Sequence, residues 1–100
     1  VSPMSDSSSD LVNVRGEIDA IDEKIIDLIG QRQAWVIEAG KLKKNEEGVR
    51  APDRVEQVIG KVRRLASEAG ASPDVVEKTY CAMISAFIEL ELGVHRETSS

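Results

Sequence analysis

The most regular feature of the chain is an apolar stripe with helical spacing between residues 14 and 42. Steps of four and three residues alternate along the stripe, as they do on one face of an α-helix. Its members are Val14, Ile18, Ile21, Ile25, Leu28, Arg32, Trp35, Ala39 and Leu42. Because no proline occurs between residues 10 and 45, the pattern predicts one helix of about 35 residues, roughly 50 Å long.

Two further helices are predicted after a loop at residues 45–52. Pro52 suits the first position of the second helix, and Gly70 suits the residue just after its end. Ser72 is a typical N-cap, and Pro73 follows it at the first position of the third helix. No strand pattern competes with this interpretation. The predicted fold class is all-α, with three helices, one long and two shorter.

The length of the chain and its Ser-rich start set the domain boundaries. One hundred residues form one domain, because a second core would be too small. Residues 1–9 are rich in Ser and Asp and lack the features of a signal peptide. We therefore expect a disordered N-terminal tail at 1–9, a helical domain at 10–97 and a short C-terminal tail at 98–100.

The long helix predicts a partner. A compact domain of this size has a radius of gyration near 13 Å, so a helix of about 50 Å extends beyond it. Two shorter helices cannot cover the whole stripe, but a second copy lying antiparallel along the first can. We expect an intertwined homodimer; the alternative is a helix that bends or breaks at Gly30.

Charge and composition exclude several classes of protein. The net charge of −5 argues against a nucleic-acid binder, and no apolar run approaches the length of a membrane span. The single cysteine, Cys81, excludes an internal disulfide and favours a cytoplasmic location. We expect Cys81 to be a small buried residue, and the lone His95 to be exposed, with no partner spacing for metal binding or acid–base chemistry. The acids of residues 17–23 lack the spacing of metal ligands, so we expect no metal there.

Several charges occupy positions that should be apolar. Arg32 interrupts the stripe, and Lys43 lies almost three turns later on the same face. Glu91 follows Phe87 by one turn on the apolar face of the third helix, and Arg54 opens the second helix. Each cation alone could keep its head in water while its stem packs. Together, an excess of buried positive charge with one acid predicts a pocket for a small polyanionic ligand.

A fifth residue at the edge of the stripe, Arg15, needs a different origin. Arg15 and Arg32 are seventeen residues apart, or about 25 Å along one helix. No small ligand spans that distance. If Arg15 contributes to the pocket, it comes from the second copy of the chain, and the dimer then holds two composite pockets.

These residues resemble the all-helical class of chorismate mutases. The resemblance covers residues 11–96 and rests on "VRGEIDAIDEKIIDLIGQR", "GKLK", "APDRVEQVI" and a polar residue at position 91. It implies an intertwined homodimer in which Arg15 of one copy and Arg32 of the other hold the carboxylates of a dicarboxylate substrate. It also implies that Lys43 donates to the ether oxygen and to a carboxylate.

The remaining implied positions are Arg54, Val55 and Glu91. Arg54 matches the arginine that opens the second helix, and Glu91 stands where most members carry glutamine as a second donor to the ether oxygen. The implied reaction is the Claisen rearrangement of chorismate to prephenate, an isomerase reaction without nucleophile, metal or cofactor. One preorganised donor to the ether oxygen is worth about 3–4 kcal/mol. We predict that Lys43, Arg32 and Glu91 are catalytic, with Glu91 acting in its protonated form.

Two departures from the family pattern concern the ring substituent of the substrate. Many members carry an acid at the position of Ala51 and a glutamate at the position of Val55, where they contact the ring hydroxyl. The stretch "APDRV" is more similar to isochorismate-pyruvate lyases and to 4-amino-4-deoxychorismate mutases than to most chorismate mutases of the class. The alternatives are therefore a mutase acting on an amino analogue, a lyase giving salicylate and pyruvate, or a non-catalytic helical dimer.

Overall fold

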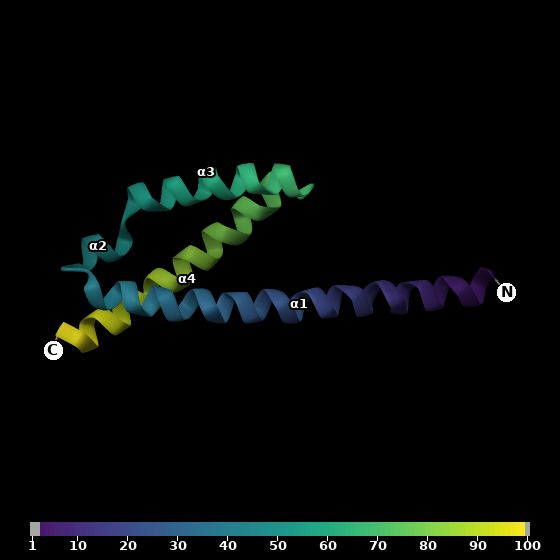
Figure 1. The fold of residues 1–100 in the computed structure, drawn as a ribbon, viewed down its shortest axis with the longest axis horizontal. Coiled ribbons are helices and arrows are strands. Elements are labelled where there is room, and N and C mark those ends of the chain that lie inside the picture. Colours follow the sequence, from purple (N-terminus) through teal and green to yellow (C-terminus); the bar gives the residue numbers. More distant parts are fainter. Residues whose placement is uncertain (1–2, 100) are drawn as a thin grey trace. The chain divides into compact units, whose positions relative to one another are not determined.

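The structure, a computed structural model, describes residues 3–99, with side chains from 9 to 97. In chain order the helices are α1 (Pro3–Leu42), α2 (Glu46–Arg50), α3 (Pro52–Ala69) and α4 (Pro73–Ser99) (Figure 1). Residues 3–99 contain no strand, so the predicted all-α class is confirmed. The short helix α2 lies inside the predicted loop at 45–52 and was not expected.

The chain divides into two compact units, Val1–Ala34 and Trp35–Ser100. α1 begins at Pro3 and α4 ends at Ser99, while residues 1, 2 and 100 lie outside the described part. The tail boundaries at residues 9 and 98 stay predictions. Within residues 3–99, no helix combines the length and the apolar character that crossing a membrane requires.

The first unit is the N-terminal part of α1, and its apolar stripe is open in the single chain. Six apolar residues between positions 11 and 28, five of them members of the stripe, are 46% to 60% exposed. They are Leu11, Val14, Ile18, Ile21, Ile25 and Leu28. A helix in water depends mostly on the packing of its apolar face, so this stripe needs a covering surface.

The second unit is built around a helical hairpin. α3 and α4 pack together, and α2 packs on α4. The core is aliphatic with one aromatic ring, as the composition requires. Its buried apolar residues are Val49, Val62, Ala66, Ile84, Phe87 and Leu92. Their helical spacing in α3 and α4 agrees with the predicted amphipathic pattern.

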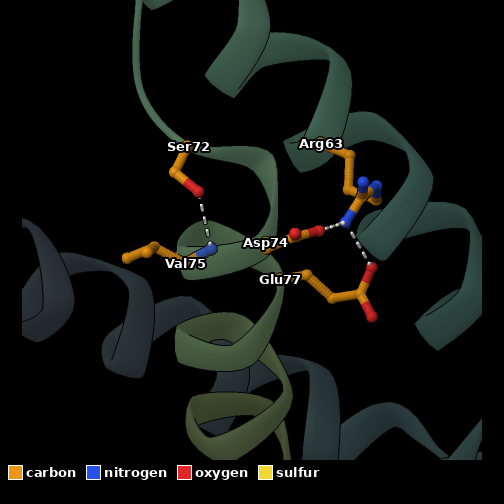
Figure 2. Close-up of polar contacts among 5 residues, drawn as sticks. All are labelled: Arg63, Ser72, Asp74, Val75 and Glu77. Carbon is orange, nitrogen blue, oxygen red and sulfur yellow. Dashed lines mark hydrogen bonds and ion pairs between the residues drawn. The ribbon is translucent and has the colours of Figure 1, made fainter.

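The turn between α3 and α4 confirms the predicted caps. Gly70 adopts φ 77° at the end of α3, a left-handed conformation that suits glycine. The amide of Ala71 donates to the carbonyl of Ala66 at 2.8 Å, which closes the helix end. Ser72 Oγ accepts from the amide of Val75 at 3.2 Å and thereby caps α4 (Figure 2).

One arginine ties the two hairpin helices together at the surface. Arg63 Nη1 donates to Asp74 Oδ1 at 3.0 Å and to Glu77 Oε1 at 2.9 Å (Figure 2). The hydrogen bond to Asp74 raises the pKa of the Arg63 guanidinium most, and the hydrogen bond to Glu77 adds to this rise. Because these side chains are solvated, the bridge orients α4 on α3 more than it stabilises the fold.

α2 and its neighbours connect α1 to α3. Asn45 Oδ1 accepts from the amide of Gly48 at 2.8 Å and caps α2, and Val49 is anchored with only 2% exposure. Ala51 closes α2 with φ 37° and ψ 63°, a left-handed conformation that costs a non-glycine residue about 1–2 kcal/mol. Pro52 then starts α3, so the chain turns sharply at this point.

The predicted burial of Cys81 is wrong. It was expected to be buried, but it is exposed. The buried face of α4 is centred on Ile84, Phe87 and Glu91. Cys81 lies to one side of that face, since each residue rotates about 100° around the helix axis.

Candidate functional site

The candidate site is centred on an ion pair between Lys43 and Glu91. Lys43 follows the last residue of α1, and Glu91 lies on the buried face of α4. Lys43 Nζ donates to Glu91 Oε1 at 2.8 Å. The Glu91 side chain is 8% exposed and that of Lys43 is 29% exposed. The structure therefore brings together the buried acid and one of the predicted cations, and leaves the ammonium partly accessible.

Gly40 allows α1 and α4 to approach closely beside this pair. Gly40 is buried, and a Cβ added there would lie 3.4 Å from Glu91 Cγ and 3.6 Å from its Oε1. The stem of Glu91 thus packs against bare backbone in the last turn of α1. This close approach holds the carboxylate near Lys43, which lies three residues further along the chain.

His95 holds the main chain of Lys43. Its Nε2 lies 3.0 Å from the carbonyl oxygen of Lys43, and because a carbonyl only accepts, Nε2 carries the hydrogen and donates. The prediction that His95 is exposed is wrong, because the residue is half-buried. The reason is that the carbonyls at the end of α1 lack helical partners, and α4 supplies one.

A second tie joins the end of α4 to α2. Arg96 Nε donates to Glu46 Oε1 at 2.7 Å. This hydrogen bond and the Arg96 charge lower the pKa of Glu46, with smaller contributions from Arg50 and His95. Both partners are solvent-exposed, so the tie restrains α2 without forming part of the core.

The other predicted site residues belong to α1 and α3. Arg54 is exposed in the first turn of α3, where its Nη1 donates to Gln57 Oε1 at 2.7 Å, and Val55 is half-buried. Arg32 is half-buried and Arg15 exposed, and both belong to the unit that ends at Ala34. Substrate binding by these four residues stays a prediction.

The arrangement suits electrostatic catalysis. An ammonium group carries three donors, and Glu91 accepts one hydrogen bond from Lys43. The partly exposed amine can therefore donate to an oxygen of a bound ligand while Glu91 holds it in place. Among the residues that the structure describes, no group of three or more His, Cys, Asp or Glu side chains is placed to hold a metal ion.

Comparison with known proteins identifies the family. The profile of chorismate mutase type II matches residues 14–92. The chain belongs to this family. It is also 31% identical over 88 residues to the isochorismate pyruvate lyase of Pseudomonas aeruginosa, which covers 88% of this chain and 87% of the lyase. The predicted resemblance to the all-helical chorismate mutases is confirmed.

The match also separates the site into two parts. Lys43 and Glu91 lie within the residues that the chorismate mutase profile covers, whereas His95 and Arg96 follow its last matched position. The contacts that His95 and Arg96 make therefore join residues beyond the matched region to residues within it. Sequence reasoning missed both, because each joins residues about fifty positions apart.

Proposed function

We propose that this member of the chorismate mutase family catalyses the Claisen rearrangement of chorismate, or of a close analogue such as 4-amino-4-deoxychorismate. In this reaction the ether C–O bond breaks while a C–C bond forms between the enolpyruvyl methylene and the ring. No proton is gained or lost, and no cofactor takes part. The Lys43–Glu91 pair is the observation that carries the proposal.

Lys43 is the proposed donor to the ether oxygen. Negative charge grows on that oxygen as the C–O bond breaks, so a fixed ammonium stabilises the transition state more than the substrate. Removing one such donor typically lowers kcat about 10²- to 10³-fold. The Lys43 side chain is 29% exposed, so it is not sealed in the core with Glu91.

Glu91 is the proposed partner of Lys43 at the reacting oxygen. Its carboxylate accepts from the Lys43 ammonium at 2.8 Å and so fixes the direction of the remaining donors. Glu91→Gln should therefore lower kcat, and an unchanged kcat in the Gln variant would refute this role.

The substrate carboxylates are the proposed ligands of the arginines. Arg32 from one copy and Arg15 from the other would hold them in bidentate pairs, with Arg54 at the start of α3. Such pairs keep the enolpyruvyl chain over the ring, which supplies much of the rate enhancement in a unimolecular reaction.

An antiparallel homodimer is the proposed assembly. The open stripe on the first unit, with residues 46% to 60% exposed, needs a cover. A second copy supplies a stripe of the same length and chemistry. Antiparallel packing also brings Arg15 of one copy towards the middle of the other α1, over the roughly 25 Å that separates it from Arg32 along one helix.

Isochorismate pyruvate lyase activity is the second candidate. Similarity to the lyase of Pseudomonas aeruginosa extends over nearly the whole chain. Ala51 and Val55 also lack the carboxylates that would contact the ring hydroxyl of chorismate. In this reaction the ether bond breaks while a ring hydrogen moves to the enolpyruvyl methylene, which yields salicylate and pyruvate.

The test is to incubate the protein separately with chorismate, isochorismate and 4-amino-4-deoxychorismate and to identify the products by mass spectrometry. Prephenate or its amino analogue supports the mutase, and salicylate with pyruvate supports the lyase. If none of the three reacts, the proposal is wrong and a non-catalytic role is favoured. Arg32→Ala should abolish turnover and keep the dimer, whereas the exposed Arg64→Ala should leave turnover unchanged.

A further inference from the structure

Lys43 is held at both ends by residues in the last turns of α4. Glu91 accepts from its ammonium at 2.8 Å, and His95 donates to its main-chain carbonyl at 3.0 Å. Glu91 and His95 are four residues apart, so they lie one above the other on the same side of α4. We infer that His95 is a positioning residue, which fixes the main chain after α1 and so places the Lys43 ammonium. The inference rests on the proposed function where it gives Lys43 a catalytic role.

The main chain at Lys43 needs such a restraint. α1 ends at Leu42, and Asn45 begins the cap of α2, so Lys43 lies in a short connection outside both helices. Its ammonium sits on a flexible four-carbon stem. A hydrogen bond from the ammonium to Glu91 alone would leave the Cα of Lys43 free to move with the connection. The second contact, from His95 to the carbonyl, removes that freedom.

The neighbouring contact on α4 shows what a purely structural tie would look like. Arg96 donates to Glu46 and joins α4 to α2 at 2.7 Å. It arises one residue after His95 and restrains the same part of the chain. Its partner, however, is an exposed side chain of α2, not the backbone of Lys43. Arg96→Ala is therefore the matched control for His95→Ala.

The chemistry of the His95 contact determines which substitutions keep it and which remove it. The Lys43 carbonyl only accepts, so Nε2 carries a hydrogen whether the ring is neutral or charged. In the neutral ring, Nδ1 then lacks a hydrogen. Glutamine can place its amide nitrogen close to the position of Nε2 and donate to the same carbonyl. His95→Gln should therefore keep the contact, whereas His95→Ala removes it.

The first arm of the test is steady-state kinetics of the full-length protein. Removing the restraint in His95→Ala should lower kcat about 10- to 100-fold, because a displacement near 1 Å can reduce the rate up to about 10²-fold. KM should change much less. His95→Gln should recover most of kcat, and Arg96→Ala should stay close to the wild type. Equal losses in His95→Ala and Arg96→Ala, or no recovery in His95→Gln, would overturn the inference.

The second arm is NMR spectroscopy, which does not depend on turnover. His95 is the only histidine in the chain, so its ring ¹⁵N signals are identified without assignment. We expect the Nε2–H tautomer in the neutral ring, and a shifted Lys43 ammonium signal in His95→Ala but not in Arg96→Ala. An Nδ1–H tautomer or an unchanged Lys43 signal would overturn the positioning role. If both spectral results hold while the wild type converts none of the three acids, only the proposed function fails.

Discussion

Replacing Lys43 with Met should destabilise the protein strongly. The change leaves the Glu91 carboxylate, 8% exposed, without its partner at 2.8 Å. At that distance and an effective dielectric constant near 20, the attraction is about 6 kcal/mol. Desolvation of the two ions opposes it by several kcal/mol, yet removing one partner of a buried pair still costs about 3–5 kcal/mol. Because Lys43 is partly solvated, we expect a loss of about 3 kcal/mol.

Removing both charges should restore most of that loss. In Lys43→Met with Glu91→Leu, two apolar side chains of similar size replace the pair, next to Phe87 and Leu92 in the core. Replacing a buried ion pair by apolar residues is often neutral or stabilising. We expect the double variant to lie within about 1 kcal/mol of the wild type. The pair would then be retained for the site rather than for stability.

The assay is urea unfolding followed by far-ultraviolet circular dichroism. All variants are compared at the same protomer concentration, because the proposed dimer would make the apparent stability concentration-dependent. Lys44→Met, at the next and exposed lysine, is the control and should change the free energy of unfolding by less than about 0.5 kcal/mol. If Lys43→Met costs less than about 1 kcal/mol, Glu91 is not a buried partner of Lys43 and the reasoning fails.

Three further outcomes follow from the same structure. Ile21→Asp should give monomers in sedimentation, because it places a carboxylate in the stripe that the proposed dimer covers. Ile26→Asp, on another face of α1, should not. Dimers in both variants would contradict the proposed interface. Ala51→Gly should raise the free energy of unfolding by about 0.5–1 kcal/mol, because glycine tolerates φ 37°. A lower free energy of unfolding in urea would be inconsistent with that strain. Arg96 lowers the pKa of Glu46 below its ordinary value of 4.5. The contribution of this ion pair to stability is therefore present at neutral pH, and it is lost as the pH falls through the lowered pKa. The urea midpoints of the wild type and Arg96→Ala should therefore converge in acid, and a constant difference would show that the pair is not the cause.

The helices were predictable because their ends are set by local chemistry. Pro52 and Pro73 start α3 and α4, and Gly70 with Ser72 closes the turn between them. α2 escaped prediction because five residues are too few for a periodic pattern. Its signal was present in "NEEG", an Asn cap followed by acids in the first turn of a helix.

The site was predictable only in part. A carboxylate on an apolar helix face requires a cation, which pointed from Glu91 to Lys43. The contact from His95 to Lys43 joins residues 52 positions apart, and no local pattern announces it. Arg54 donates to Gln57, three residues further along α3, and its role in binding a substrate stays a prediction.

The most direct test of the proposed function compares turnover of chorismate, isochorismate and 4-amino-4-deoxychorismate by the wild type with that of the Lys43→Met, Glu91→Leu double variant. Both proteins are expected to be folded and dimeric, which circular dichroism and sedimentation verify first. We expect the wild type to convert one of the three acids, and the double variant to leave all three at the uncatalysed rate. Equal turnover in the two proteins, or no turnover of any of the three by the wild type, would contradict the proposed function.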